Sequence, residues 1–396
     1  MQRIYLDHNA TTPVHPLVLE TMLPYLAWEF GNPSSAHYFG QRASQAIEGA
    51  REAVAALIGA RSSEIVFTSG GTEADNAAIL GVVGHAQRTQ KESGRPPLHV
   101  ITTAIEHDAV LNACRALEAR GVSVTYVPAE RDGIVSLAAV RSAIRPETAL
   151  ISVMHANNEI GTLQPIEEIE QIAAEADIPF HTDAVQSTGK IPIDVNRLGV
   201  DLLSLSAHKF YGPKGVGALF VRKGVEIDPL LYGGGNERGR RAGTENVAAI
   251  AGLGKACELA RSDMAEASAH LCELRNRLEE GLLARIPGAC VNGHPARRTP
   301  NTLSLMLPGV DSESLVIALD LAGLSCSAGA ACSSGAVDPS HVLTAIGLIP
   351  AEARASLRFS VGRANTREEI DKALELIPAA VARQRDAAAK REMARA

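Results

Sequence analysis

The fold is decided by the stretch FHTDAVQSTGKIPIDVNRLGVDLLSLSAHKFYGPKGVG, residues 180–217. A short apolar run ends at Asp183, and a second run, DLLSLS, ends at Ser206, shortly before Lys209. Both runs have the length and composition of buried strands. Ligands of open α/β sheets bind at the carboxyl ends of the strands. We therefore expect Asp183 and Lys209 to meet at the ligand-binding edge of a sheet.

A carboxylate and a lysine at that edge suit pyridoxal phosphate, a cofactor that needs a partner for its ring nitrogen and an amine for its aldehyde. Asp183 could instead cap a helix. Lys214 is a rival amine, although a lysine in the turn GPKG is more often solvated. Ser206 and Lys209 also match the S-x-x-K element of penicillin-recognising enzymes, but the sequence lacks the S-D-N and K-T-G elements. We expect Lys209 to hold the cofactor.

Strand-like runs and helical patterns alternate through the first part of the chain, which predicts a mostly parallel sheet with helices on both faces. The run VGALFV after Lys209 is expected to add an antiparallel strand. The predicted fold class is α/β, with a mostly parallel mixed sheet in a large domain and a smaller α+β C-terminal domain. We expect the large domain over residues 15–260 and the smaller one, which carries a cysteine loop, over residues 1–14 and 261–396.

Composition excludes several classes of protein. The net charge is −7, and 46% of the 396 residues are hydrophobic, so nucleic acid is not an expected partner. The N-terminus has no apolar core of signal-peptide length, and no apolar run approaches the roughly 18 residues of a membrane span. The six cysteines are scattered without metal-ligand spacing, which argues against a zinc site or a disulfide framework and for a cytoplasmic protein.

Other positions could carry chemistry. The turn SGGT at 69–72 lies between a predicted strand and a predicted helix and could bind a phosphate, or be only a capped turn. His107 follows a strand and could stack on a ring and move protons, or cap a helix. Cys332 lies among small residues and could be a nucleophile, whereas Cys326 is expected to be packed. Arg358 could bind a carboxylate or form a buried salt bridge.

Together these residues resemble the cysteine desulfurases of the nitrogen-fixation and iron–sulfur-cluster type, in the class-V aminotransferase family. These enzymes have the fold-type I architecture of pyridoxal phosphate enzymes. The resemblance runs nearly end to end through ordered motifs at family-like spacing. These motifs are YLDHNATTP, GNPSSAH, FTSGGTEADN, EHDAVL, ANNEIGT, HTDAVQS, SAHKFYGPKG, GRRAGTEN, AGAACSSG and LRFSVGR.

The resemblance implies roles for the matching residues in binding the cofactor. Lys209 would form the imine with it. The phosphate would be held by Gly71, Thr72, Ser206, His208 and, from the second subunit of a dimer, Thr244. The ring would be contacted by Asp183 at its nitrogen, Gln186 at its hydroxyl, Asn158 beside it and His107 stacked on it. No metal is implied.

The implied catalytic residues are Cys332, Lys209 and His107, with Asn158 and Arg358 holding the substrate carboxylate. The implied reaction removes sulfur from L-cysteine, giving L-alanine and a persulfide on Cys332. The sulfur would pass to a scaffold protein for iron–sulfur cluster assembly or to another thiolation acceptor. Selenocysteine lyase and pyridoxal phosphate aminotransferase are the alternative activities, and a catalytically silent scaffold of this fold is the alternative from another class. The expected partners therefore include a second copy of the chain and a sulfur-acceptor protein, but no membrane.

Overall fold

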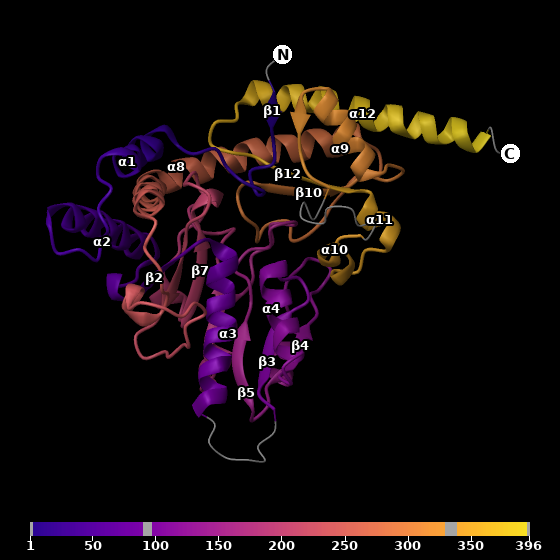
Figure 1. Cartoon of the computed structure of the whole chain (residues 1–396). Helices are drawn as coiled ribbons and strands as arrows, with labels where there is room; N and C mark the ends of the chain where they lie inside the picture. The colour runs from indigo at the N-terminus through magenta and orange to yellow at the C-terminus, as the bar shows by residue number, and fades with distance from the viewer. Residues whose placement is uncertain (1–2, 90–96, 329–338, 394–396) are drawn as a thin grey trace.

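A seven-stranded sheet forms the centre of the computed structural model, which describes residues 3–89, 97–328 and 339–393 (Figure 1). Its strand order is β2-β8-β7-β6-β5-β3-β4. Strand β8 is antiparallel to both of its neighbours, and the pairs from β7 to β4 are parallel. The strands are β2 (Ile65–Thr68), β3 (His99–Thr103), β4 (Ser123–Val127), β5 (Thr148–Ser152), β6 (Phe180–Asp183), β7 (Leu202–Ser206) and β8 (Gly217–Val221).

Helices cover both faces of this sheet because successive strand residues point to opposite sides. Val100 and Leu150 join a core cluster with α3 and α4, whereas Ile101 and Ile151 join a larger cluster on the other face. The helices that connect the strands are α3 (Gly71–Thr89), α4 (Asp108–Glu118), α5 (Leu137–Ala143), α6 (Ile166–Glu175) and α7 (Val195–Leu198). Short 3₁₀ turns are η1 (Ser62–Glu64), η2 (Ala207–Lys209) and η3 (Asn236–Gly239).

Two smaller sheets lie beyond the carboxyl edge of the large sheet, in the upper part of Figure 1. One has the order β12-β10-β9, and the other pairs β1 with β11 in parallel. The strands are β1 (Ile4–Tyr5), β9 (Cys290–Val291), β10 (Thr302–Met306), β11 (Leu324–Ser325) and β12 (Ser356–Ser360). The helices of this region are α9 (Ser312–Leu321), α10 (His341–Ala345), α11 (Pro350–Arg354) and α12 (Arg367–Met393).

The long helix α8 (Val247–Arg285) connects the two regions. Its first half, including Leu253, packs into the core of the large sheet. Its second half, including Leu274 and Leu282, packs into a separate core with Ile4 and Leu6. Helices α1 (Pro16–Ala27) and α2 (Tyr38–Ile58) pack against the same helix. The division into residues 15–260 and residues 1–14 with 261–396 stays a prediction, which these separate cores support.

The predicted fold class is confirmed, including the antiparallel strand after Lys209. None of the helices in the described ranges has the length and apolar character needed to cross a bilayer. Across the same ranges, no group of three or more His, Cys, Asp or Glu side chains is placed to hold a metal ion.

A buried hydrogen-bonded chain crosses the middle of the sheet. His181 on β6 is fully buried, with Nδ1 2.8 Å from Ser152 Oγ on β5 and Nε2 3.0 Å from Ser204 Oγ on β7. Burial lowers the pKa of His181 from 6.5 to about 3, because a charged ring would lose its hydration. The folded protein therefore binds fewer protons here than the unfolded chain between these two pH values, and the free energy of unfolding must fall as the pH decreases through this window.

We predict that His181 alone removes about 2 kcal/mol of folding stability between pH 7 and pH 5. In His181→Gln, the loss of urea-unfolding free energy between pH 7 and pH 5 should be smaller than in the parent by about that amount. His85→Gln, at a partly exposed position on α3, is the control and should keep the parent's pH dependence. An unchanged pH dependence in His181→Gln would contradict this assignment.

Candidate active site

A cavity of about 430 Å³ lies at the carboxyl edge of the large sheet. The loops after five parallel strands and one strand of the small region line it. Ten of the residues expected from the sequence meet there: Gly71 and Thr72 after β2, His107 after β3, Asn158 after β5, Asp183 and Gln186 at and after β6, Ser206, His208 and Lys209 at and after β7, and Arg358 on β12.

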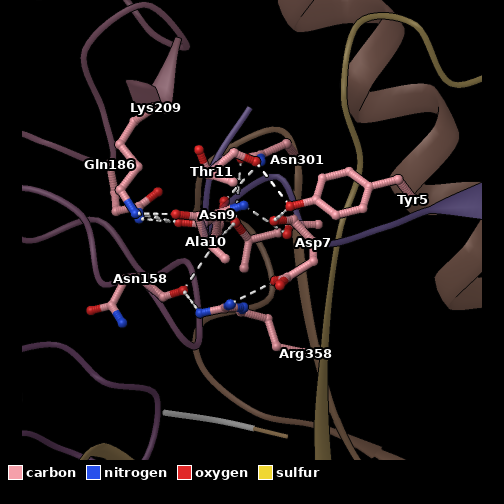
Figure 2. A network of polar contacts seen from close by, with 12 residues as sticks. Tyr5, Asp7, Asn9, Ala10, Thr11, Asn158, Gln186, Lys209, Asn301 and Arg358 are labelled. Atoms are coloured by element: carbon pink, nitrogen blue, oxygen red, sulfur yellow. Dashed lines mark hydrogen bonds and ion pairs between the residues drawn. The ribbon is translucent and has the colours of Figure 1, made fainter. Parts of the chain in front are cut away.

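Lys209 belongs to η2, directly after β7. Its Nζ donates to the backbone oxygens of Asn9 at 2.7 Å and Ala10 at 2.8 Å. Figure 2 shows this amine and the Gln186 amide converging on the same N-terminal segment. Lys214, in contrast, is exposed and does not line the cavity. The structure thus places Lys209, rather than its sequence neighbour, at the site.

Asp183 forms a capping contact and also lies where the functional alternative requires it. Its Oδ1 accepts a hydrogen bond of 2.8 Å from the Val185 N–H, so it caps the following turn, and it also lines the cavity. Burial raises the pKa of Asp183, while His107 and Lys209 act in the opposite direction. Behind it, Asp75 is also buried, and its pKa is raised by burial and by Asp183. A cation brought against Asp183 would therefore relieve the cost of its negative charge.

The turn between β2 and α3 leaves room for an anion. Gly70 has φ +153°, which only glycine adopts readily, and a Cβ on Gly71 would lie 2.7 Å from Val185 Cγ2. The first amides of α3 have no carbonyl partners within the helix and point out of its N-terminus. Ser206 lies across from them, with Cβ 3.6 Å from the position of that added Cβ. A phosphate fits this cradle.

His208 also lines the cavity, with Nδ1 3.1 Å from Thr11 Oγ1. Burial, together with the cations of Lys209, Lys214 and Lys190, lowers the pKa of His208 to about 4. Its ring is therefore neutral near pH 7 and can either donate or accept a hydrogen bond, but it adds no charge to a bound anion.

His107 is the N-cap of α4, as the structural alternative predicted, and it also lines the cavity. Its Nδ1 accepts from the Ala109 N–H at 3.1 Å. Because Nδ1 is an acceptor, the ring carries its proton on Nε2 when it is neutral. The cap fixes the ring, and Nε2 is the atom left for proton transfer.

Arg358 forms the contact of the structural alternative and also lines the cavity. It forms a buried salt bridge, Nη2 to Asp7 Oδ1 at 2.8 Å, and Nη1 donates to the Asn158 backbone oxygen at 3.0 Å (Figure 2). Arg358 Nε and Asn158 Oδ1 are buried and have no hydrogen-bond partner among the described residues. Buried polar atoms without partners are costly. These two atoms therefore mark where a polar ligand would be bound.

One predicted site residue does not line this cavity, and another is not among the described residues. Thr244 lies in an exposed loop and does not line the cavity of its own chain. Cys332 lies outside the described residues. Cys326 is packed, as expected, and burial raises the pKa of its thiol to about 12.

Sequence reasoning missed several residues of the site. Asn9 and Ala10 belong to the motif YLDHNATTP, to which no role was given, and His341 belongs to no motif, yet all three line the cavity. Lys190 was passed over as part of a connection, but it is buried next to Gln186. The available signal for Lys190 was a lysine directly after four small or polar residues, QSTG, in the turn that follows Asp183.

The donor set fits pyridoxal phosphate. An anion cradle, a buried carboxylate and a lysine amine surround one cavity, which matches the phosphate, ring nitrogen and aldehyde of that cofactor. The unpartnered Arg358 Nε is a donor that suits a substrate carboxylate, and the unpartnered Asn158 Oδ1 is an acceptor that suits an N–H or O–H group of a ligand.

Comparison with known proteins shows the family to which the chain belongs. The family model described as aminotransferase class-V matches residues 4–373. A protein of Methanosarcina thermophila named cysteine desulfurase IscS is 51% identical over 97% of this chain and 93% of its own length. One of Clostridium botulinum with the same name is 49% identical over 97% of this chain and 96% of its own length.

Solved structures of similar proteins support the same family. A protein titled "NIFS-LIKE PROTEIN" superposes with a TM-score of 0.89 at 40% identity, covering 96% of this chain and all of its own. A second, titled "SspA in complex with cysteine", has a TM-score of 0.80 at 41% identity and covers 92% of this chain and all of its own. The chain therefore belongs to the class-V aminotransferase family, whose members depend on pyridoxal phosphate.

Proposed function

We propose that this protein is a pyridoxal phosphate-dependent cysteine desulfurase. The observation that carries the proposal is the meeting of Lys209 and Asp183 in one cavity with His107 and Arg358. The names of the close relatives, and the neighbour solved with cysteine, support L-cysteine as the substrate. The overall reaction is L-cysteine plus the Cys332 thiol giving L-alanine plus a Cys332 persulfide.

Bound pyridoxal phosphate supplies an aldehyde for the substrate amine and a ring that accepts electrons from the substrate α-carbon. We assign the protein's part as follows. The α3 N-terminus, with Ser206, holds the phosphate, and the Asp183 carboxylate keeps the ring nitrogen protonated. Lys209 would hold the cofactor at rest, and either the Lys209 amine or His107 Nε2 would move the α-proton.

Arg358 and Asn158 are assigned to the substrate carboxylate. Because Asp7 and the Asn158 backbone already fix two edges of the guanidinium, its orientation is set before the substrate arrives. Little side-chain entropy is then lost on binding.

Cys332 is assigned as the sulfur acceptor, and the stems of its segment support this. At one stem, the backbone of Ser327 pairs with that of Arg358, with N···O distances of 3.1 and 2.8 Å. At the other, His341 lines the cavity, and its Nε2 lies 2.9 Å from the Glu106 oxygen. The described residues on both sides of the Cys332 segment are thus held by residues that line the cavity.

We further propose that the sulfur passes to an iron–sulfur scaffold protein or another acceptor that docks beside the Cys332 loop and the C-terminal region. Exposed apolar side chains of Ile317 and Leu321 on α9, and of Ile349 just before α11, lie before and after this loop in sequence and are candidate docking residues. A cytoplasmic location is also proposed. It is supported by five described cysteines, Cys114, Cys257, Cys272, Cys290 and Cys326, all of which are free thiols.

The protein is also proposed to be a homodimer whose second subunit supplies Thr244. Helix α1, the segment after it and the start of α2 expose large apolar side chains, which we call the apolar patch: Leu17, Leu19, Leu23, Leu26, Trp28, Phe30, Tyr38 and Phe39. Large exposed apolar surfaces are typical of protein interfaces. Thr244 lies just before α8, the helix that packs against both α1 and α2.

The catalytic assignment predicts that Cys332→Ala and Lys209→Ala each form alanine from L-cysteine at least ~100-fold more slowly than the parent. The two variants lose activity for different reasons, which absorbance separates. Cys332→Ala should keep the absorbance band of the cofactor bound to Lys209, and Lys209→Ala should lack this band. Alanine and sulfide are measured with a reductant present. Cys290→Ala, an exposed cysteine on β9, is the matched control and should behave as the parent.

Alanine formation at the parent rate by Cys332→Ala would refute the thiol's role. Turnover of selenocysteine but not cysteine would indicate a selenocysteine lyase, and a keto acid product an aminotransferase.

The dimer assignment predicts a mass twice the chain's 41.7 kDa by light scattering. Phe30 stacks on Phe39 with ring centroids 5.2 Å apart in the apolar patch. A charge at Phe30 in a desolvated interface is costly. Phe30→Asp should therefore shift the mass toward 41.7 kDa and weaken cofactor binding, because Thr244 of the partner is lost. Leu321→Asp, on α9, should do neither, and a monomeric parent would contradict the assignment.

A further inference from the structure

Lys190 is a buried lysine that the proposed mechanism does not use. Its exposed fraction is 7%, and it closes a turn in which residues 186–190 are all buried. Lysines are almost never fully buried unless their amine has a partner. Among the described residues, no carboxylate forms an ion pair with Lys190, so a salt bridge does not explain its position.

The amine of Lys190 is instead held by two carboxamides. It donates to Gln186 Oε1 at 2.8 Å and to Asn9 Oδ1 at 3.2 Å. Gln186 lies four residues earlier in the same turn, whereas Asn9 comes from the N-terminal segment. Both acceptors are the oxygens of their amides, and an amine, charged or neutral, can meet them only through its N–H groups.

The two contacts fix which way each amide faces. With its oxygen bound to Lys190, Gln186 must turn Nε2 away from it, and this atom donates to the Asn9 backbone oxygen at 3.0 Å. The Asn9 amide is likewise oriented, since its Nδ2 donates to the Asn158 backbone oxygen at 3.0 Å and to Thr302 Oγ1 at 2.8 Å. Figure 2 shows Asn9 at the centre of these contacts.

Asn9 in turn joins Lys190 to the rest of the site. The Asn9 backbone oxygen accepts from Lys209 Nζ. The Asn158 backbone oxygen, which accepts from the Asn9 side chain, also accepts from Arg358. The contacts of Lys190 therefore brace the base of the cavity against the N-terminal segment. Burial, with the cations of Lys209 and Arg358, lowers the pKa of Lys190 well below its usual range, which a surface lysine would not experience.

We propose that Lys190 is a positioning residue that orients the Gln186 amide so that its N–H side, not its oxygen, faces the cofactor. This rests on the proposed function, in which Gln186 meets the ring hydroxyl of pyridoxal phosphate. Without the lysine, Gln186 Oε1 loses its partner in a buried place, and rotation of the amide would turn an acceptor toward an oxygen of the cofactor. Two acceptors facing each other weaken binding.

The test is a double-mutant cycle on cofactor affinity. Apo protein of the parent, Lys190→Met, Gln186→Ala and the double variant is titrated with pyridoxal 5′-phosphate, and the dissociation constant is read from the absorbance of the bound form. Lys190→Met keeps the length and removes the donor. It should raise the dissociation constant by ~10- to 100-fold in the parent background, the range expected for a hydrogen bond to a charged or buried group. In the Gln186→Ala background, Lys190→Met should change the dissociation constant by less than about twofold.

Controls separate positioning from general damage. Lys372→Met, an exposed lysine on α12, should bind as the parent does. Lys190→Gln, with a shorter N–H donor, should lie between the parent and Lys190→Met, and it replaces Lys190→Met in the cycle if that variant does not fold. An equal loss in both Gln186 backgrounds, or a dissociation constant within twofold of the parent, overturns the inference. A parent that binds no pyridoxal phosphate overturns the proposed function itself.

Discussion

The site depends on one geometric constraint, which is that neighbouring parallel strands end at the same edge of their sheet. Strands β6 and β7 are paired in parallel, with Asp183 in register with Ser204. Asp183 closes the first strand, and Lys209 follows the second within one turn of 3₁₀ helix. A carboxylate and an amine are thus delivered to one cavity by backbone hydrogen bonding alone, before any ligand contributes.

The N-terminal segment completes the site from outside the sheet. Its backbone accepts from Lys209 and Gln186, its Asp7 holds Arg358, and its Asn9 side chain holds Lys190. Four side chains from distant parts of the sequence are therefore oriented by a few residues near the start of the chain. The contacts of Asn9 with Gln186 and Lys190 are buried, so these two contacts are costly to break. This segment explains how cationic side chains can lie close together without a matching number of carboxylates.

Sequence could predict the sheet and the placement of Asp183, Lys209 and His107, because these follow from local patterns: an apolar run, its end and the residue beyond. It could not predict the part of Asn9 or Lys190, since hydrogen bonds over more than 180 positions leave no periodic signal. For Asp183, His107 and Arg358 it offered a structural and a functional role as alternatives. In the structure each of the three side chains makes its structural contact and also lines the cavity. A functional site requires side chains that are fixed in this way. The family resemblance, not composition, selected Cys332 and Thr244.

The central claim is that the cofactor is held by Lys209 at the carboxyl edge of the sheet. Borohydride reduction of the purified protein loaded with pyridoxal phosphate fixes the bond between cofactor and lysine, and peptide mass mapping then locates it. The account predicts that the added mass lies on the peptide containing Lys209 and that Lys190 and Lys214 are unmodified. A cofactor reduced onto any other lysine would contradict it.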